Sequence, residues 1–239
     1  MSEQVTITKK AIYTAIWEAK QVSAPSRVID LLRAFIKPAP KAPQSSVGAL
    51  RIAWVVGHNS KATGAYAKAP VKMSEYGFNS VVGDDLVNYA ESDPTIEVKV
   101  FKRKPISSYN GQMTECYRRV NKWKPDIVIE AHFNWLNGEG RIEMISHPNS
   151  TKGKIICDIA GDEWFKALGS NFDYKHVTRG SNDRGGLGLA LANAPACLTE
   201  PFDCSNQDHL KIIAEMGTDG VSKTYYKIFQ RLTKHDSFI

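Results

Sequence analysis

From residue 49 onward, short apolar runs alternate with segments whose apolar residues recur at helical spacing. The strand-like runs are residues 51–56, 96–101, 127–131, 142–146 and 196–199. The helical patterns between them are residues 76–90, 113–122, 152–167 and 208–232. Strands joined by crossover helices predict an α/β fold, with a twisted, mostly parallel but mixed sheet flanked by helices on both faces.

The first part of the chain differs from the rest. Residues 1–36 have helical periodicity, and the stretch "KPAPKAPQSSVG" that follows is rich in Pro, Ala, Ser and Lys, without apolar periodicity. That composition is typical of a semi-extended linker. For a chain of 239 residues we therefore predict a short helical N-terminal extension and linker over residues 1–46 and a single domain over residues 47–239.

Charge and hydropathy narrow the possible partners. The net charge of +6 favours an anionic partner, either nucleic acid or an anionic cell envelope. No basic stripe interleaved with aromatic residues is present, so nucleic-acid binding is not expected. No run approaches the roughly 18 apolar residues of a membrane span, and the stretch "MSEQVTITKK" lacks the apolar segment of a secretory signal. We expect a protein made in the cytoplasm and not inserted in a membrane.

Three of the apolar runs end in a residue that can bind a metal or transfer a proton. The run "IAWVVGH" ends in His58, "DIVIEAHFN" contains His132, and "APACLTEPF" contains Glu200. In open α/β sheets, reactive groups gather where strands end and loops begin. A single histidine at a strand end is usually structural, but three such ends in one chain indicate a reactive site.

A hydrolytic zinc site needs three nitrogen or oxygen ligands and leaves a fourth position for water. His58 and His132 offer two imidazoles, and Glu75 at the start of a predicted helix offers a carboxylate. Glu200 is then available as the base that such a site also needs. The sequence contains neither a His-Glu-x-x-His helix nor a Gly-x-Ser-x-Gly elbow, so other common hydrolase arrangements are not supported.

The order of these four residues and their surroundings resembles the zinc-dependent N-acetylmuramoyl-L-alanine amidases of the Amidase_3 family. The matching blocks are "VVGHNSKATGA", "SEYGFN", "PDIVIEAHFN" and "DRGGLGLALANAPACLTEPFDCSNQDHLKII", spread over residues 51–233. Each block alone is weakly specific. Four blocks in the family's order, at roughly its spacing, make the resemblance strong.

The resemblance implies a role for each position. His58, Glu75 and His132 would hold one zinc ion, and Glu200 would be the catalytic base. The substrate would be peptidoglycan, cleaved at the amide between the lactyl group of muramic acid and the L-alanine of the stem peptide. Supporting substrate-binding residues would be Asn134, Trp135 and Arg184.

The chain departs from the family pattern at two places. Asn59 and Ser60 follow His58 where the family usually has glycines, which should stiffen this loop. Pro201 follows Glu200 and fixes its own φ, so the loop beyond Glu200 should be shaped differently. These departures leave the four predicted chemical groups intact and leave substrate preference open.

The absence of an export signal favours a phage-type endolysin, a monomer that acts on the cell wall after release from the cytoplasm. Two alternatives remain. One is a small-molecule amidohydrolase similar to the N-formylglutamate amidohydrolases, which would need a closed pocket with paired arginines. The other is a non-catalytic peptidoglycan-binding module, although such a module would have no need of Glu200 as a base.

Overall fold

The computed structural model describes residues 48–106, 108–169 and 172–238. Residues 45–239 form one compact unit. The predicted helical extension and linker over residues 1–46 lie outside the described residues.

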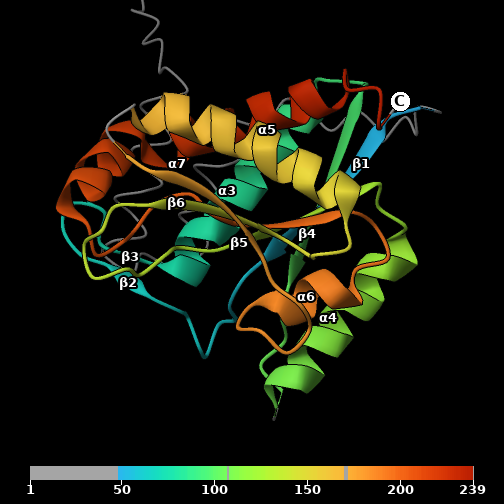
Figure 1. Ribbon diagram of the computed structural model, residues 1–239, viewed down its shortest axis with the longest axis horizontal. Coiled ribbons are helices and arrows are strands. Elements are labelled where there is room, and N and C mark those ends of the chain that lie inside the picture. The colour runs from blue at the N-terminus through green and yellow to red at the C-terminus, as the bar shows by residue number, and fades with distance from the viewer. Residues whose placement is uncertain (1–47, 107, 170–171, 239) are drawn as a thin grey trace, which may run out of the picture. The chain divides into compact units, whose positions relative to one another are not determined.

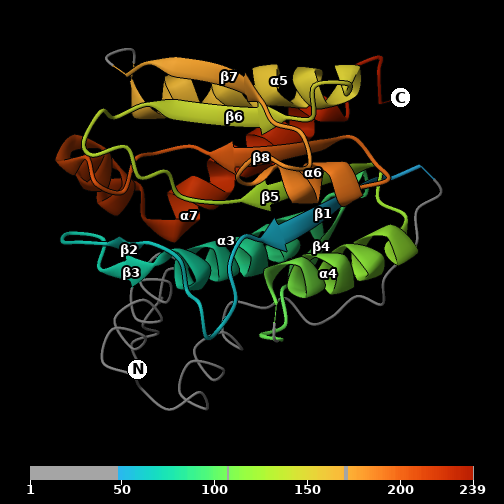
Figure 2. The ribbon, with the colours of Figure 1, turned by 60° about the horizontal axis from the view of Figure 1, so that its bottom comes forward.

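The central sheet has six strands in the order β4-β1-β5-β8-β6-β7 (Figure 2). The strands are β1 (Leu50–Val56), β4 (Ile96–Lys102), β5 (Ile127–Ala131), β6 (Ile142–Ser146), β7 (Tyr174–Thr178) and β8 (Ala196–Glu200). Strands β4, β1, β5 and β8 run parallel, whereas β6 pairs antiparallel with β8 and β7 pairs parallel with β6. The predicted mostly parallel, mixed sheet is confirmed.

Helices cover both faces of this sheet, as predicted. Helices α3 (Glu75–Ala90), α5 (Thr151–Leu168) and α7 (Gln207–Leu232) cover one face, where α7 packs against both α3 and α5. Helices α4 (Tyr109–Trp123) and α6 (Gly186–Leu191) pack together on the side opposite α5 (Figure 1). No helix in the described part of the chain is both long enough and apolar enough to cross a membrane.

Aromatic side chains fill the layer between the sheet and helices α5 and α7. Tyr225 of α7 lies edge-on to Trp54 of β1 and to Trp164 of α5, with ring centroids 4.6 and 5.2 Å apart. All three side chains are fully buried. Such edge-to-face aromatic pairs add to the free energy gained from burial alone, so this layer fixes α5 and α7 against the strands.

The other face has an aliphatic layer. Ala53 and Val55 of β1, together with Val128 of β5, lie in one buried cluster with Met113 of α4 and Leu189 of α6. Because side chains alternate along a strand, every second residue of β1, β5 and β8 faces α4 and α6. The same alternation determines which polar residues, just beyond the ends of these strands, lie close together on one face of the sheet.

Four short elements were not predicted: β7, α6, and a hairpin of β2 (Tyr66–Ala67) and β3 (Met73–Ser74). Strand β7 has the sequence "YKHVT", lies at the edge of the sheet and is only partly buried. Helix α6 has the sequence "GLGLAL", and glycine disfavours helices. Both elements owe their conformation to packing against the sheet rather than to local propensity.

The close contact between α3 and β1 gives a test of this packing. A Cβ added at Gly83 would lie 2.6 Å from Cδ1 of Trp54 and 3.1 Å from Cγ2 of Val100. We expect Gly83→Ala to lower the free energy of unfolding by about 1–3 kcal/mol, because overpacking outweighs the helix propensity of alanine. Urea denaturation measures the change. The matched control is Asn88→Ala on the partly exposed side of the same helix, which should stay within about 0.5 kcal/mol of the parent, and an equal effect of both variants would contradict this account.

Candidate metal centre and active site

The first predicted ligand, His58, follows directly on the end of β1. The N–H of Gly57 donates to the carbonyl of Ala131 at 3.1 Å and so extends the pairing of β1 with β5 by one step. A Cβ at Gly57 would lie only 2.4 Å from Cε1 of His132. Glycine is therefore required at this position, because the ring of His132 occupies the space beside it.

The loop after His58 is ordered by the residue that replaces the family's glycine. Asn59 is buried, and its Oδ1 accepts from the N–H groups of Lys61 and Ala62, both at 2.9 Å. Its Nδ2 donates to Oε1 of Gln112 on α4 at 2.8 Å. The side chain of Asn59 thus closes the turn and ties it to α4, in the manner of an Asx turn.

The second predicted ligand, Glu75, is the first residue of α3. Ser74 caps this helix, with its Oγ accepting from the N–H of Gly77 at 3.2 Å. A carboxylate in the first turn is favoured by the helix dipole. The first residue of α3 is thus the residue whose ionised carboxylate is buried, at the end of the helix where the dipole favours negative charge.

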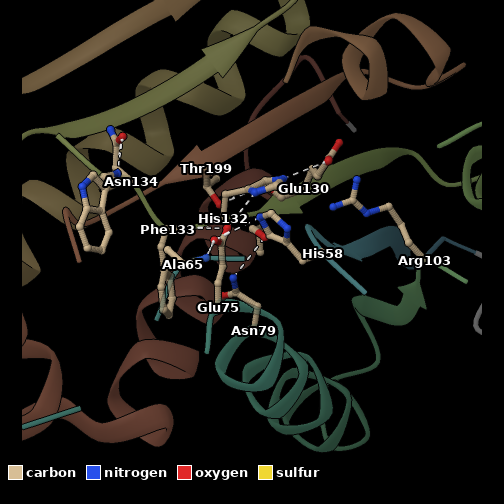
Figure 3. Close-up of polar contacts among 12 residues, drawn as sticks. His58, Ala65, Glu75, Asn79, Arg103, Glu130, His132, Phe133, Asn134 and Thr199 are labelled. Atoms are coloured by element: carbon tan, nitrogen blue, oxygen red, sulfur yellow. Dashed lines mark hydrogen bonds and ion pairs between the residues drawn. The ribbon is translucent and has the colours of Figure 1, made fainter. Parts of the chain in front are cut away.

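The carboxylate of Glu75 lies between the two histidines (Figure 3). Its Oε2 is 3.2 Å from Nε2 of His58, and its Oε1 is 2.8 Å from Nδ1 of His132. The N–H groups of Ala65 and Phe133 donate to Oε2 and Oε1 at 3.0 and 2.9 Å. Each oxygen thus has one backbone donor and one imidazole, which fixes the carboxylate in place.

Gly64 makes room for this arrangement. Its φ of +76° lies in the left-handed region, and an added Cβ would be 2.5 Å from both Oε2 of Glu75 and Cδ2 of His58. Only glycine accepts that backbone conformation easily. The resemblance matched this glycine without explaining it, and the structure shows that it lets the loop pass close to the two side chains.

The three predicted ligands converge. One donor atom from each of His58, Glu75 and His132 lies within 4.8 Å of the other two. The donor set is nitrogen, oxygen and nitrogen, on side chains that are buried or partly buried. Three donors this close together can bind one metal ion, with a further position left for water or substrate.

The charges of the cluster formed by His58, Glu75 and His132 favour the binding of a cation. Burial alone would raise the pKa of Glu75, but its hydrogen bonds with His132 and His58 hold that pKa well below the usual range. Burial alone would lower the pKa of His132, but contacts with Glu130 and Glu75 raise it to about 10. The buried carboxylate of Glu75 therefore requires positive charge beside it, from a protonated imidazole or from a metal ion.

The structure adds a residue that the sequence interpretation missed. Glu130 of β5 precedes His132 by two positions, is buried, and has its Oε1 3.1 Å from Nε2 of that histidine. Its Oε2 accepts from the hydroxyl of Tyr117 on α4 at 2.5 Å. The available signal was a charged residue inside the apolar run "DIVIEAHFN", where a buried carboxylate needs partners.

Glu200, the predicted base, is the last residue of β8 and lies beside His132. Strand β5 pairs Ala131 with Thr199, and the N–H of His132 donates to the carbonyl of Thr199 at 2.9 Å. His132 and Glu200 therefore occupy neighbouring positions on two parallel strands, with side chains on the same face of the sheet.

The surroundings of Glu200 shift its acidity. Burial is the main cause that raises the pKa of Glu200 to about 7, and the charge of Glu143 adds to it, while His132 and Arg179 oppose the shift. Glu143 is the register partner of Glu200 across β6 and β8. A carboxyl group with a pKa near neutrality can both accept and donate a proton at physiological pH.

The predicted substrate-binding residues differ in exposure. The indole of Trp135 is 48 % exposed, whereas Asn134 is buried, with its Oδ1 accepting from the N–H of Trp135 at 2.9 Å. Asn134 also forms an isolated bridge with Asp203. Arg184 is exposed in the turn between β7 and α6, and its carbonyl accepts from Nη1 of Arg179 at 3.0 Å. A substrate role for these residues stays a prediction.

A comparison with known families gives a match over most of this chain. The model of the Amidase_3 family, described as N-acetylmuramoyl-L-alanine amidase, matches residues 52–227. The chain belongs to this family. The match extends from β1 to α7 and contains the positions of all four predicted residues. The predicted membership of the Amidase_3 family is confirmed.

Solved structures share the Amidase_3 fold. The catalytic domain of the CD27L endolysin targeting Clostridia difficile is 21% identical, with a TM-score of 0.62 over 76% of this chain and 97% of that one. An N-acetylmuramoyl-L-alanine amidase from Clostridium difficile 630 is 17% identical, with a TM-score of 0.64 over 79% and 99%. The amidase AmiC2 of Nostoc punctiforme is 13% identical, with a TM-score of 0.58 over 79% and 100%. A search of curated proteins found no match.

The raised pKa of Glu200 predicts a pH-dependent stability of this amidase-family domain. Between pH about 4.5 and 7 the folded protein keeps a proton on Glu200 that the unfolded chain has released. The free energy of unfolding should therefore fall as pH rises across this window, by at most about 1.4 kcal/mol per pH unit. Glu200→Gln removes that contribution.

The measurement is urea denaturation of the parent and of Glu200→Gln from pH 4.5 to 7.5 in the presence of a chelator. We expect the variant to gain stability relative to the parent as pH rises. A difference between the two proteins that is constant over this range would show that the pKa of Glu200 is not raised.

Proposed function

We propose that the protein is a zinc-dependent N-acetylmuramoyl-L-alanine amidase that cleaves the amide between the lactyl group of muramic acid and the L-alanine of the stem peptide. The observation that carries this proposal is the convergence of His58, Glu75 and His132, with Glu200 at the neighbouring strand position. Membership of the Amidase_3 family supplies the substrate class, which is peptidoglycan.

Zinc is the metal that these donors fit best. Two imidazole nitrogens and one carboxylate oxygen are a common ligand set of catalytic zinc, which prefers tetrahedral sites with ligand distances of about 2.0–2.2 Å. The separation of 3.2 Å between Glu75 and His58 is near the roughly 3.4 Å expected between two ligands of one such ion. The 2.8 Å between Glu75 and His132 is a hydrogen-bond distance, which zinc binding would lengthen. A zinc ion bound there would supply a Lewis acid that polarises the scissile carbonyl and activates water.

Glu200 accepts and then donates the proton that is transferred during the reaction. With a pKa near 7, its carboxylate is partly ionised at neutral pH and accepts the proton of the attacking water. The same group, once protonated, donates to the alanine nitrogen as the amide bond breaks. The Lewis acid and this proton carrier have separate tasks, which explains why the site needs a carboxylate that does not bind the metal.

The exposed indole of Trp135 is proposed to contact the sugar of the substrate. It follows the strand-end segment that carries His132, and an aromatic face of this kind stacks well on a pyranose ring. Asn134 and Arg184 are proposed as supporting contacts. The net charge of +6 would favour adhesion to an anionic wall over the screening distance of about 8 Å.

We further propose that the protein acts as an endolysin, that is, in the lysis of bacterial cells. The catalytic domain of the CD27L endolysin shares the fold over almost its whole length. If this role holds, the purified protein added to cells with permeabilised membranes should lyse them and release muropeptide fragments. Cleavage of isolated muropeptides without lysis of such cells would reject the role and leave the amidase proposal intact.

The amidase proposal predicts metal-dependent cleavage of muropeptides. The intact protein should release free lactyl-muramic acid ends and new alanine amino termini, lose this activity in chelator, and regain it on addition of zinc. Glu200→Gln should reduce kcat by about 10²–10⁴-fold, because the proton carrier is lost, while zinc binding is retained. Product analysis by mass spectrometry measures both effects.

The matched control is Glu97→Gln, which changes an exposed glutamate that is 54 % accessible on β4 and should leave kcat unchanged. N-formyl-L-glutamate, the substrate expected for a small-molecule amidohydrolase, should remain uncleaved. Undiminished cleavage by Glu200→Gln would remove Glu200 from the base role, and preferred cleavage of N-formyl-L-glutamate would overturn the substrate assignment.

A second prediction concerns Trp135. Replacing it with alanine should raise KM for polymeric peptidoglycan severalfold and leave kcat nearly unchanged, because the indole contributes binding that is equal in ground and transition states. The control is Trp135→Phe, which retains an aromatic face and should lose less affinity. An unchanged KM for Trp135→Ala would show that the indole does not contact the substrate.

A further inference from the structure

Glu130 is a buried carboxylate that the family resemblance does not assign. We propose that Glu130 is a positioning residue, which holds the imidazole of His132 in the tautomer and orientation that present Nδ1 to the metal ion. This inference rests on the proposed zinc site and deepens it, since it concerns how this chain prepares one of the three ligands.

The alternation of the strand places Glu130 against one nitrogen of His132 only. Both residues lie on the same face of β5, and Oε1 of Glu130 is 3.1 Å from Nε2 of the ring. The other nitrogen, Nδ1, faces Glu75 at 2.8 Å. When Nε2–H donates to Glu130, the neutral imidazole has its lone pair on Nδ1, on the side where the three ligands converge.

The second oxygen of Glu130 is also held. Its Oε2 accepts from the hydroxyl of Tyr117 at 2.5 Å. Helix α6 approaches this pair so closely that a Cβ at Gly188 would lie 2.0 Å from Oε2 of Glu130 and 2.6 Å from the hydroxyl of Tyr117. With both oxygens occupied and the helix packed behind it, the carboxylate of Glu130 cannot rotate to become a metal ligand.

A buried cation lies near this carboxylate. Arg103 follows the end of β4 and is only 5 % exposed. Its guanidinium points toward Glu130 in Figure 3. Nη1 of Arg103 is 3.0 Å from the thioether sulfur of Met113, and its Nε has no hydrogen-bond partner in the described part of the chain. The positive charge of Arg103 offsets the negative charge of Glu130 within the interior.

A hydrogen bond from a metal-binding histidine to a carboxylate affects how tightly the metal is bound. A metal-binding histidine whose second nitrogen donates to a carboxylate is fixed in tautomer and ring orientation, and loss of that partner lowers metal affinity or activity by about 10–100-fold. Tyr117, Glu130 and His132 form such a chain of hydrogen bonds behind the proposed ion. Glu130 therefore acts through His132 and does not itself contact substrate.

The test is the zinc affinity of the full-length protein, measured by competition with a fluorescent zinc chelator. Glu130→Leu, which removes the acceptor, should weaken zinc binding by about 10–100-fold. Glu130→Gln retains an acceptor oxygen for Nε2–H and should lose less affinity than Glu130→Leu. The matched control is Asp85→Asn, which changes a buried carboxylate on α3 that accepts from the hydroxyl of Ser222 and should leave zinc affinity unchanged.

A spectroscopic measurement separates positioning from a general loss of structure. Imidazole ¹⁵N correlation spectra of the zinc-loaded parent should show His132 protonated at Nε2, with Nδ1 bound to the metal. In Glu130→Leu the Nε2–H signal should weaken through exchange with water, and in Glu130→Gln it should persist. If Glu130→Leu does not fold, Glu130→Gln and Tyr117→Phe still test the proposal. Each of these substitutions weakens the hydrogen bonds that link Tyr117, Glu130 and His132 without creating a large cavity in the core.

The outcomes distinguish this inference from the proposed function. Zinc affinities within about twofold of the parent for both Glu130 variants would overturn the positioning role while leaving a zinc amidase intact. A loss in Asp85→Asn as large as in Glu130→Leu would also overturn it, since any buried carboxylate would then have the same effect. Failure of the parent itself to bind zinc would instead reject the proposed function, and this inference with it.

Discussion

The buried carboxylate of Glu75 is the constraint on which the rest of the site depends. An ionised carboxylate is costly to bury unless it is compensated by hydrogen bonds and positive charge. The chain meets this requirement with two backbone N–H donors and two imidazoles, and those imidazoles come from the ends of β1 and β5. To bring them there, Gly57 and Gly64 must lack side chains. The need to stabilise one negative charge therefore determines the loop conformations around it.

The parallel sheet brings a further carboxylate, Glu200, next to this cluster. Gly57, His132 and Glu200 lie at the same level across β1, β5 and β8, one step beyond the last residues paired between β1 and β5 and between β5 and β8. Since residues in register on parallel strands share a face, the ligand His132 and the proposed base Glu200 lie next to each other. The proposed place of reaction therefore lies at the carboxyl ends of these strands.

Much of this organisation was predictable from the sequence, for identifiable reasons. The apolar runs of β1, β5 and β8 are short and end in polar residues, so the strand ends and the groups at them could be located. Strand β7 and helix α6 could not be predicted, because the partly exposed β7 lacks a clear apolar alternation and α6 contains glycines. Glu130 was missed because periodicity identifies a buried strand but does not show which residue of another helix, here Tyr117, will satisfy a charge within it. Partners that are distant in sequence are determined only by the packing of the whole fold.

The carboxyl groups of Glu75 and Glu200 differ in acidity although both are largely buried. Burial acts on both Glu75 and Glu200, but hydrogen bonds with two histidines hold the pKa of Glu75 low. Among the described residues no comparable set of donors reaches Glu200, and its pKa rises to about 7. A carboxylate that stays ionised is suited to bind a cation, and one that titrates near neutrality is suited to transfer protons. The separation of the two pKa values follows from the number of donors that reach each side chain. The acidities of the two side chains thus support the proposal that Glu75 binds the metal ion and Glu200 transfers protons.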